Sequence, residues 1–418
     1  MMNDKNLGSQ KNKLKEIKRT PELRFKGFSD DWEERKLGDL ANIVRGASPR
    51  PIQDSKWFDK DSDIGWLRIS DVTDQNGRIH HLEQRISKLG QEKTRVLKEP
   101  HLLLSIAATV GKPLVNYVKT GVHDGFLIFL NPSFEREFMF QWLEMFRPNW
   151  KKYGQPGSQV NLNSELVRNQ EIPLPSIEEQ QKIGSFFKQL DDTIALHQRK
   201  LDKLKQLKQG YLQQLFPKPG ETVPKIRFAN FEGEWEERKL RTLLIKNSKK
   251  NKDLTIKNVE SISNRTGFTK QTEQFDEYSV ASADLSNYYV ITEQQFAYNP
   301  SRINVGSIAY KPIGDDTSVV SPLYVSFSTK KILNDSFLWN WFKTSSFENQ
   351  RQRLSEGGVR DTLSFNQLSE MSIVIPQYLE QVKIGNFFKQ LDFLITLHQE
   401  KLKQLKTCKK ALLQKMFI

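Results

Sequence analysis

Four short segments of this 418-residue chain contain residue types that catalytic sites use. The first, residues 131–134, reads NPSF, and amino-methyltransferases use an Asn/Asp-Pro-Pro-Tyr/Phe loop. Here Ser133 stands where the second proline is needed, and no glycine-rich cofactor loop precedes it. The segment is better interpreted as a turn before a helix.

The other three segments, which are two EERK copies and a histidine pair, are equally weak as catalytic sites. Residues 33–36 and 236–239 both read EERK, which has the E-x-K spacing of some nuclease sites, but no upstream aspartate is suitably spaced in both copies. His80 and His81 form an isolated pair, and the six histidines have no metal-ligand spacing. No dinucleotide-binding or phosphate-binding glycine motif is found. The sequence therefore predicts a chain with no catalytic centre and no cofactor or metal of its own.

The elements around these segments are duplicated. Residues 179–201 return as residues 380–402 at an offset of 201, with 17 of 23 positions identical. Residues 21–37 return as residues 224–240, and both copies end in WEERKL. Between these blocks, residues 44–150 and 246–342 cannot be aligned by eye. One frame with two different inserts indicates one scaffold that presents two different readers.

Charge and composition point to a polyanionic partner. The chain has 64 Lys+Arg against 50 Asp+Glu, a net charge of +14. Such an excess favours nucleic acid, although charge alone leaves open a basic surface without a specific role. The single cysteine, Cys408, and the short apolar stretch at 102–110 predict a cytoplasmic protein that does not cross a membrane.

Two proline-free segments, 178–216 and 379–417, have apolar residues that alternate by four and three, which is typical of a coiled-coil seam. Each predicts a helix of about 40 residues, or roughly 60 Å. Gly184 and Gly385 either let another helix approach closely or are simply tolerated. Lys208 and Lys409 continue the seam, where polar residues fix register or lie at a wet edge. The seam is Ile183, Phe187, Leu190, Ile194, His197, Leu201, Leu204, Ile384, Phe388, Leu391, Ile395, His398, Leu402 and Leu405.

We expect an α+β protein with a pseudo-twofold internal repeat, in which two globular mixed domains are held apart by two long antiparallel coiled-coil helices. The expected parts are a mobile basic tail (1–20), the first domain (21–176), the first helix (177–216), a stiff proline-rich linker (217–224), the second domain (225–377) and the second helix (378–418). Within the domains, residues 66–72, 101–112, 307–313 and 321–328 are predicted strands, and 134–146 and 336–347 are predicted helices.

Candidate DNA contacts are polar and basic residues in loops, because base edges are read by Arg, Asn, Gln, Lys and Ser, and phosphates are bound by Lys and Arg. Two glycine-rich loops, 151–161 and 349–362, precede the last strand of each domain. For any single residue, a solvated surface position is the competing interpretation. The candidates are Arg45, Ser48, Arg50, Arg68, Arg78, Lys151, Lys152, Gln155, Ser158 and Gln159 in the first domain, and Asn264, Arg265, Lys270, Arg302, Asn304, Lys311, Arg351, Arg353 and Arg360 in the second.

The matched P-x-x-x-EQ-x-KI blocks with their FFKQLD continuation, the paired WEERKL segments and the two dissimilar inserts together resemble the specificity subunit of type I restriction–modification systems, over nearly the whole chain. Two other interpretations stay open. One is a duplicated coiled-coil interaction scaffold without sequence-specific DNA binding, and the other is an enzyme that acts on nucleic acid by itself.

The resemblance implies that each insert is a target-recognition domain that reads half of an asymmetric bipartite site in double-stranded DNA. It implies that the helices set the half-site spacing and dock two methylation subunits, and that two restriction subunits join the complex. S-adenosylmethionine, ATP and Mg would then belong to the partner subunits of a non-catalytic chain. The resemblance also implies a cytoplasmic, bacterial protein that associates with the nucleoid through DNA.

Overall fold

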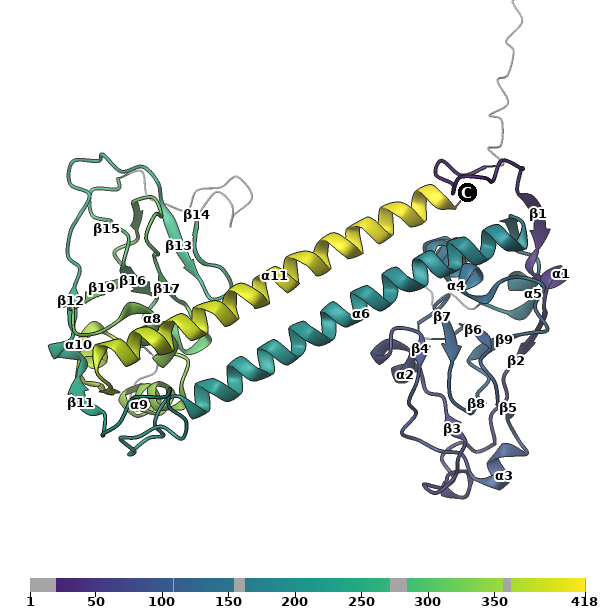
Figure 1. The fold of residues 1–418 in the computed structure, drawn as a ribbon, viewed down its shortest axis with the longest axis horizontal. Coiled ribbons are helices and arrows are strands. Elements are labelled where there is room, and N and C mark those ends of the chain that lie inside the picture. The colour runs from purple at the N-terminus through teal and green to yellow at the C-terminus, as the bar shows by residue number, and fades with distance from the viewer. Residues whose placement is uncertain (1–19, 108, 154–161, 271–283, 356–361, 418) are drawn as a thin grey trace, which may run out of the picture. The chain divides into compact units, whose positions relative to one another are not determined.

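The computed structural model describes residues 20–107, 109–153, 162–270, 284–355 and 362–417, apart from the side chains of Lys151, Tyr153 and Ser355. The chain divides into two compact units (Figure 1). The first contains Met1–His197 and Lys401–Ile418, and the second contains Gln198–Glu400. Each unit therefore takes residues from both copies of the repeat.

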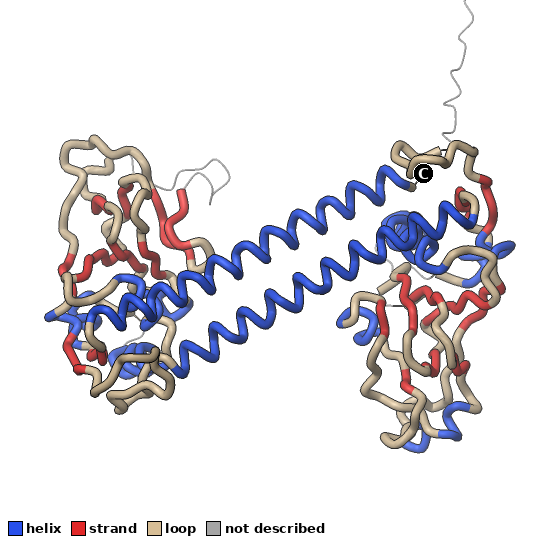
Figure 2. The backbone as a smooth tube through the Cα atoms, in the orientation of Figure 1, coloured by secondary structure: helices blue, strands red, loops and turns tan. Residues whose placement is uncertain are grey.

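The first unit combines two small sheets, a two-stranded ribbon and short helices (Figure 2). The five-stranded sheet has the order β2 (Asn42–Arg45), β9 (Phe126–Leu130), β6 (Leu102–Ser105), β7 (Pro113–Asn116) and β4 (Arg78–Ile79). The three-stranded sheet has the order β3 (Gly65–Trp66), β8 (Thr120–Val122) and β5 (Arg95–Leu97). The ribbon pairs β1 (Glu33–Lys36) with β10 (Glu171–Leu174). The helices are α1 (Leu37–Leu40), α2 (Ile69–Asp74), α3 (Lys88–Gln91), α4 (Arg136–Phe146), α5 (Ser164–Arg168) and the 3-10 turns η1 (Ser55–Trp57) and η2 (Arg147–Tyr153).

The second unit has a different central sheet. Its four strands have the order β12 (Leu244–Lys246), β19 (Val325–Thr329), β16 (Gln295–Tyr298) and β17 (Ile308–Tyr310). Three antiparallel ribbons pair β13 (Glu260–Ser263) with β14 (Gly267–Lys270), β15 (Tyr289–Ile291) with β18 (Ser318–Val320), and β11 (Glu236–Lys239) with β20 (Ser372–Ile375). The helices are α8 (Asp335–Trp341), α9 (Ser345–Ser355), α10 (Phe365–Glu370) and the 3-10 turns η3 (Leu240–Thr242) and η4 (Ile303–Val305).

Two long helices, α6 (Ile177–Gln214) and α11 (Tyr378–Met416), contribute to both units. In the first unit, Phe187 near the start of α6 packs against Phe417 after the end of α11, with ring centroids 5.9 Å apart. In the second unit, Phe216 after the end of α6 packs against Phe388 near the start of α11. The start of each helix meets the end of the other, so the two run antiparallel. The expected fold class is confirmed.

The repeated sequence blocks form the same contacts in each unit. Arg24 pairs with Glu179 in the first unit and Arg227 pairs with Glu380 in the second, both at 2.7 Å. The Leu23 amide donates to the Lys415 carbonyl, as the Ile226 amide donates to the Gln214 carbonyl. The frame is therefore duplicated in structure as well as in sequence.

Gly184 and Gly385 are needed for close packing. A Cβ at Gly184 would lie 2.8 Å from the Phe138 backbone nitrogen, and one at Gly385 would lie 2.7 Å from the Ser336 Cβ. The element that approaches is the N-terminal end of α4 or α8, so close approach is the correct interpretation of these glycines.

One predicted strand is wrong. Residues 66–72 form a strand only at Trp66, and helix α2 begins at Ile69. The Asp71 carboxylate accepts hydrogen bonds from the backbone nitrogen and the side chain of Arg68, which caps the helix start. The predicted helix at 336–347 is also divided, because α8 ends at Trp341 and α9 begins at Ser345.

Candidate nucleic-acid interface

Three predicted contacts in the first unit converge on one residue, Asp124, two of them on its carboxylate and one on its backbone carbonyl. The Ser48 hydroxyl donates to Asp124 Oδ1 at 2.9 Å, the Arg50 Nη2 lies 2.8 Å from Oδ2, and Arg45 donates to the Asp124 backbone carbonyl. Burial raises the pKa of Asp124, but the Ser48 hydrogen bond and the two arginine charges outweigh it and leave the pKa below its ordinary value. The structure thus brings Arg45, Ser48 and Arg50 into one loop cluster, with both arginines exposed.

The other two arginines predicted as DNA contacts in the first domain, Arg68 and Arg78, are ion-paired. Arg68 lies 2.9 Å from Asp71. Arg78 lies 2.6 Å from Glu137 and 3.6 Å from Asp191 on α6, and its guanidinium stacks over the Phe140 ring at 3.9 Å. Burial opposes the positive charge of Arg78, but Glu137 and Asp191 outweigh it and raise its pKa. Arg50 is ion-paired as well, but its side chain is 76% exposed, against 38% for Arg68 and 17% for Arg78, so these two are weaker candidates for phosphate contacts than Arg50.

Several of the predicted DNA contacts lie in or beside segments outside the described residues. Lys152 is exposed at the end of η2, and the backbone of Lys151 belongs to the same turn. Gln155, Ser158, Gln159 and Arg360 lie outside the described residues. Arg353 is exposed on α9.

Two predictions in the second domain need correction. Lys311 is only 1% exposed, and its ammonium donates to Glu260 at 2.7 Å and to Ser318. Arg351 is 5% exposed and bonds Glu348 on the same helix. Both cations are occupied inside the protein, so neither presents its charge to a ligand in this structure. The sequence could not show the Lys311 pair, because Glu260 is 51 residues away and meets it only in the fold. Glu348 stands three residues before Arg351, so that pair was available from the sequence once the helix was recognised.

The remaining candidates of the second domain are on the surface. Asn264 and Arg265 are exposed in the turn between β13 and β14, and Lys270 is exposed at the end of β14. Arg302 and Asn304 are exposed near η4. Of these five, the structure brings Asn264 and Arg265 together in one groove.

That groove, of about 620 Å³, contains two residues that were not predicted from the sequence, Trp339 and Lys343. The Lys343 ammonium lies 4.3 Å from the centre of the Trp339 ring. Burial lowers the pKa of Lys343 to about 7, and the nearby Lys208 adds to the effect. The ammonium is thus desolvated by its neighbours, while the residue as a whole keeps solvent-exposed surface. The clustered aromatic residues in WNWFK were the available sequence signal, but they also fit a core helix.

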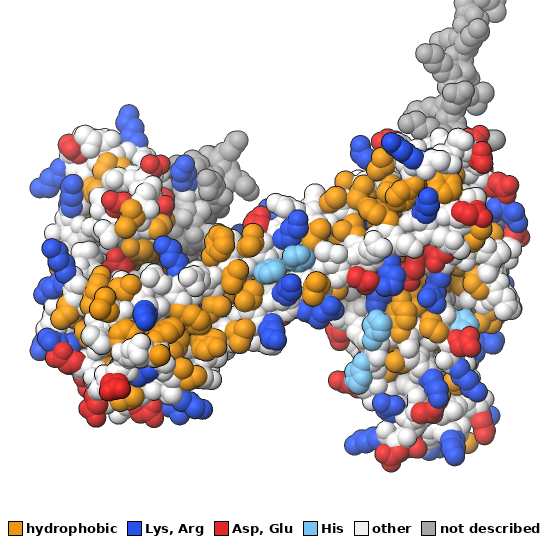
Figure 3. Space-filling model, viewed as in Figure 1, with side chains coloured by type: hydrophobic (Ala, Val, Ile, Leu, Met, Phe, Trp, Pro, Cys, Tyr) orange, Lys and Arg blue, Asp and Glu red, His pale blue; other side chains and the backbone are white. Residues whose placement is uncertain are grey.

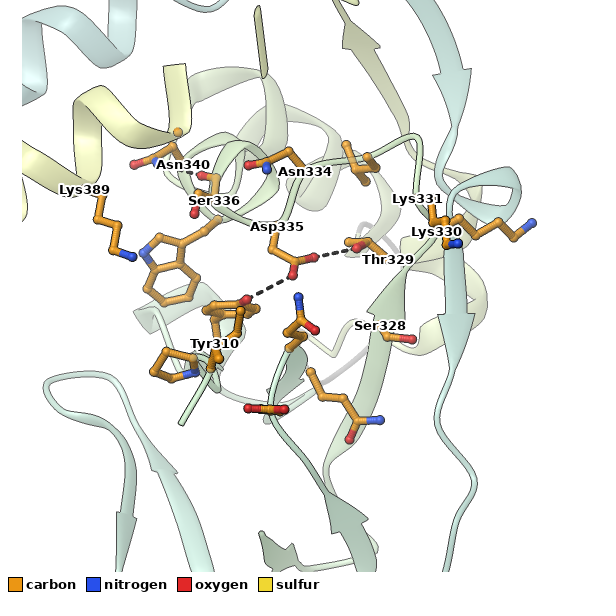
Figure 4. A pocket seen from close by; sticks show the side chains of 18 of the residues that line it. Tyr310, Ser328, Thr329, Lys330, Lys331, Asn334, Asp335, Ser336, Asn340 and Lys389 are labelled. Carbon is orange, nitrogen blue, oxygen red and sulfur yellow. Dashed lines mark hydrogen bonds between the residues drawn. The ribbon is translucent and has the colours of Figure 1, made fainter. Parts of the chain in front are cut away.

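A second cleft, of about 980 Å³, lies beside the same elements (Figure 4). The Tyr310 hydroxyl and the Thr329 hydroxyl both donate to the Asp335 carboxylate, at 2.9 and 2.5 Å. Burial and the Asp335 charge raise the pKa of Tyr310, which keeps it a neutral donor. Lys330 and Lys331 point away from these three residues (Figure 4). Tyr310, Thr329 and Asp335 thus satisfy one another's hydrogen bonds within this cleft.

The predicted helix seam is buried or half-buried at all fourteen positions. The two lysines that continue it are paired with aspartates that sequence reasoning missed. Lys208 of α6 bonds Asp392 of α11 in the second unit, and Lys409 of α11 bonds Asp191 of α6 in the first. Each ion pair joins the two helices, and the two pairs are equivalent at the repeat offset of 201.

Neither a group of three or more His, Cys, Asp or Glu suited to a metal ion nor a helix long and apolar enough to cross a membrane is found among the described residues. The EERK segments are ribbon strands β1 and β11, with largely exposed side chains.

Comparisons with known proteins agree with the repeat. The family model for the type I restriction modification DNA specificity domain matches twice, at residues 29–206 and 232–407. The chain is 21% identical to the putative type I restriction enzyme MjaX specificity subunit of Methanocaldococcus jannaschii, over 92% of each chain. It is also 21% identical to the MjaVIII specificity subunit of the same organism, over 92% of this chain and 91% of that one. The fold resembles the S subunit of a type I restriction-modification system from M. genitalium, with a TM-score of 0.62, 13% identity and coverage of 96% of this chain and 99% of that one.

Proposed function

Because the chain belongs to the type I restriction–modification DNA specificity family, we propose that each of its two recognition domains reads one half of an asymmetric bipartite DNA site. The observation that carries this proposal is a duplicated frame with two different inserts. The ribbons β1–β10 and β11–β20 are equivalent, whereas the sheet is five-stranded in one unit and four-stranded in the other. Because the two inserts differ while the ribbons that hold them are equivalent, the two domains can present different side chains to two different base sequences.

We further propose that α6 and α11 set the distance between the half-sites. A helix has a fixed rise of about 1.5 Å per residue, so its length is a defined spacing. The ion pairs Lys208–Asp392 and Lys409–Asp191 oppose sliding of one helix along the other, because a shift of one turn would separate both pairs. Polar groups in a helix seam commonly fix register in this way.

The helices also offer a surface for partner subunits. Hydrophobic side chains are exposed along α11 (Figure 3), and Phe393, Leu394 and Leu397 are 67%, 39% and 52% exposed. Exposed apolar patches of this kind mark protein interaction sites. We propose that two methylation subunits dock on the helices, that two restriction subunits join the assembly, and that the partners rather than this chain bind S-adenosylmethionine, ATP and Mg²⁺.

The test is the pattern of adenine methylation across the genome of cells with this gene intact or deleted, with expression of the methylation subunit verified in both. We expect one asymmetric bipartite motif to lose its methylation on deletion. If every methylated motif persists, the chain does not specify the target, and the interaction scaffold becomes the better account.

A further inference from the structure

The groove beside the β13–β14 turn differs from its counterpart in the first unit. Helices α4 and α8 are equivalent: the N-cap residues Glu135 and Asn334 each accept from the backbone nitrogen three residues ahead. Their own backbone nitrogens donate to Gln180 and Gln381, which are 201 residues apart. This alignment places Phe140 of α4 at the position of Trp339 of α8.

Each of these aromatic rings has a cation over its face, but the two cations have different surroundings. Arg78 over Phe140 is neutralised by Glu137, 2.6 Å away. The residue of α8 equivalent to Glu137 is Ser336, which carries no charge. Lys343 over Trp339 accordingly forms no ion pair with an acid among the described residues. The first unit compensates the cation internally, and the second leaves it open to the groove.

Other charged groups near Lys343 do not neutralise it. Asp392 on α11 is already bonded to Lys208 of α6, and Lys208 itself repels a second cation. Arg265 lines the groove from the β13–β14 turn and has no acidic ion-pair partner among the described residues. Asp315 also lines the groove and is the one acid there. When Lys343 is protonated, the groove thus carries an excess of positive charge, contributed by two elements far apart in the sequence.

We propose that this groove binds the sugar–phosphate backbone of the half-site read by the second recognition domain, with Lys343 and Arg265 as its phosphate ligands. Asn264 and Thr266 of the same turn line the groove and supply neutral donors. Phosphate contacts from two separate elements orient a domain on the duplex, while base edges supply the sequence information. This inference rests on the proposed function and adds the residues that perform part of it.

The proposal makes DNA binding depend on pH in a defined direction. With a pKa of about 7, Lys343 is largely neutral above pH 8 in the absence of DNA. A phosphate favours the charged ammonium, so binding takes up a proton and affinity falls as pH rises through this range. An arginine at this position stays charged at every relevant pH, because its pKa exceeds about 12.

The test uses the full chain in complex with its methylation subunits and a duplex that carries the methylated motif. Dissociation constants are measured by fluorescence anisotropy between pH 6.5 and 8.5 at fixed ionic strength, and again against salt at pH 6.5. At pH 6.5 we expect Lys343→Met to weaken binding about tenfold and to reduce the log–log salt slope by about 0.9. At pH 8.5 the variant should approach wild type. Lys343→Arg should bind tightly with a flatter pH profile.

Lys331→Met removes an exposed lysine of the same unit that does not line the groove, and it is the matched control. Thermal melting of each variant separates a folding defect from lost binding, and the arginine variant supplies the rescue. If Lys343→Met matches Lys331→Met at both pH values while wild type prefers its motif, the groove does not bind the backbone. If wild type shows no preference for the motif, the proposed function itself fails.

Discussion

Asp191 and Asp392 are equivalent residues of the two long helices, and each bonds a lysine of the other helix. Asp191 accepts from Lys409 and from Gln141 and lies 3.6 Å from Arg78, so one carboxylate connects α11, α4 and the sheet strand β4. Its counterpart Asp392 bonds Lys208 but is 41% exposed. Equivalent residues in the two units therefore contribute differently to stability.

We predict that Asp191→Ala lowers the free energy of unfolding by roughly 2–3 kcal/mol, because it leaves partly buried cations without their partner. Asp392→Ala should cost about 1 kcal/mol or less, since water screens the more exposed pair. Urea unfolding of the full chain measures both. Equal losses in the two variants would show that the extra partners of Asp191 contribute nothing.

Asp124 gives a prediction about pH. Its lowered pKa means that the ionised form stabilises the folded state above the ordinary carboxyl pKa, and that this stabilisation is lost as pH falls through the folded value. The difference in unfolding free energy between wild type and Asp124→Asn should be largest above about pH 5 and shrink toward pH 3. A difference independent of pH would mean that the Arg45–Arg50 cluster does not depend on the carboxylate charge.

At the scale of elements, the sequence predicted the long helices well, because a 4-3 pattern free of proline has few other structures available. The sequence predicted the secondary structure and the ion pairs within the globular domains less well. Asp71 capped a helix inside a predicted strand, and Lys311 proved to be buried with Glu260, which is 51 residues away in the sequence. Arg351 proved to be buried beside Glu348 of its own helix. Arg45, Ser48 and Arg50 could be grouped from the sequence because they lie within six residues of one another, whereas Lys343 and Arg265 are 78 residues apart and meet only in the fold.

Substitutions at Gly184 and Gly210 test how closely α6 packs against its neighbours. Gly184→Ala should destabilise the chain by about 1–3 kcal/mol, because the new Cβ meets backbone of α4 that cannot move aside. Gly210→Ala on the same helix is the control, since nothing lies within 4 Å of a Cβ there, and it should stabilise by up to about 1 kcal/mol. Destabilisation of both variants to the same extent would disprove the packing argument.

The exposed apolar side chains of α11 give a second prediction at this scale. Phe393→Asp should weaken binding of a methylation subunit at least tenfold, because it places a charge in the centre of an apolar interface. Gln399→Asp, an exposed position on the same helix, should leave binding nearly unchanged. Calorimetric titration of the methylation subunit compares the two. Unimpaired binding by Phe393→Asp would locate the docking surface elsewhere.

At the scale of the whole molecule, the two units use one frame and differ in what they present. Leu23 and Ile226 make the same bond to the end of a long helix, and the ribbons β1–β10 and β11–β20 bound each insert in the same register. An insert should therefore be exchangeable between frames without disturbing the helices. This modularity is the structural basis for assigning one half-site to each domain.

The most direct measurement of that claim is the methylated motif produced by a chain in which residues 240–371 are replaced by a second copy of residues 37–170. Both junctions lie next to the equivalent ribbon strands. When it is expressed with the methylation subunits, the complex should methylate a motif made of two inverted copies of the first half-site, with the wild-type spacing, as mapped genome-wide. Retention of the original second half-site would contradict the account, because the replaced insert could not then be its reader.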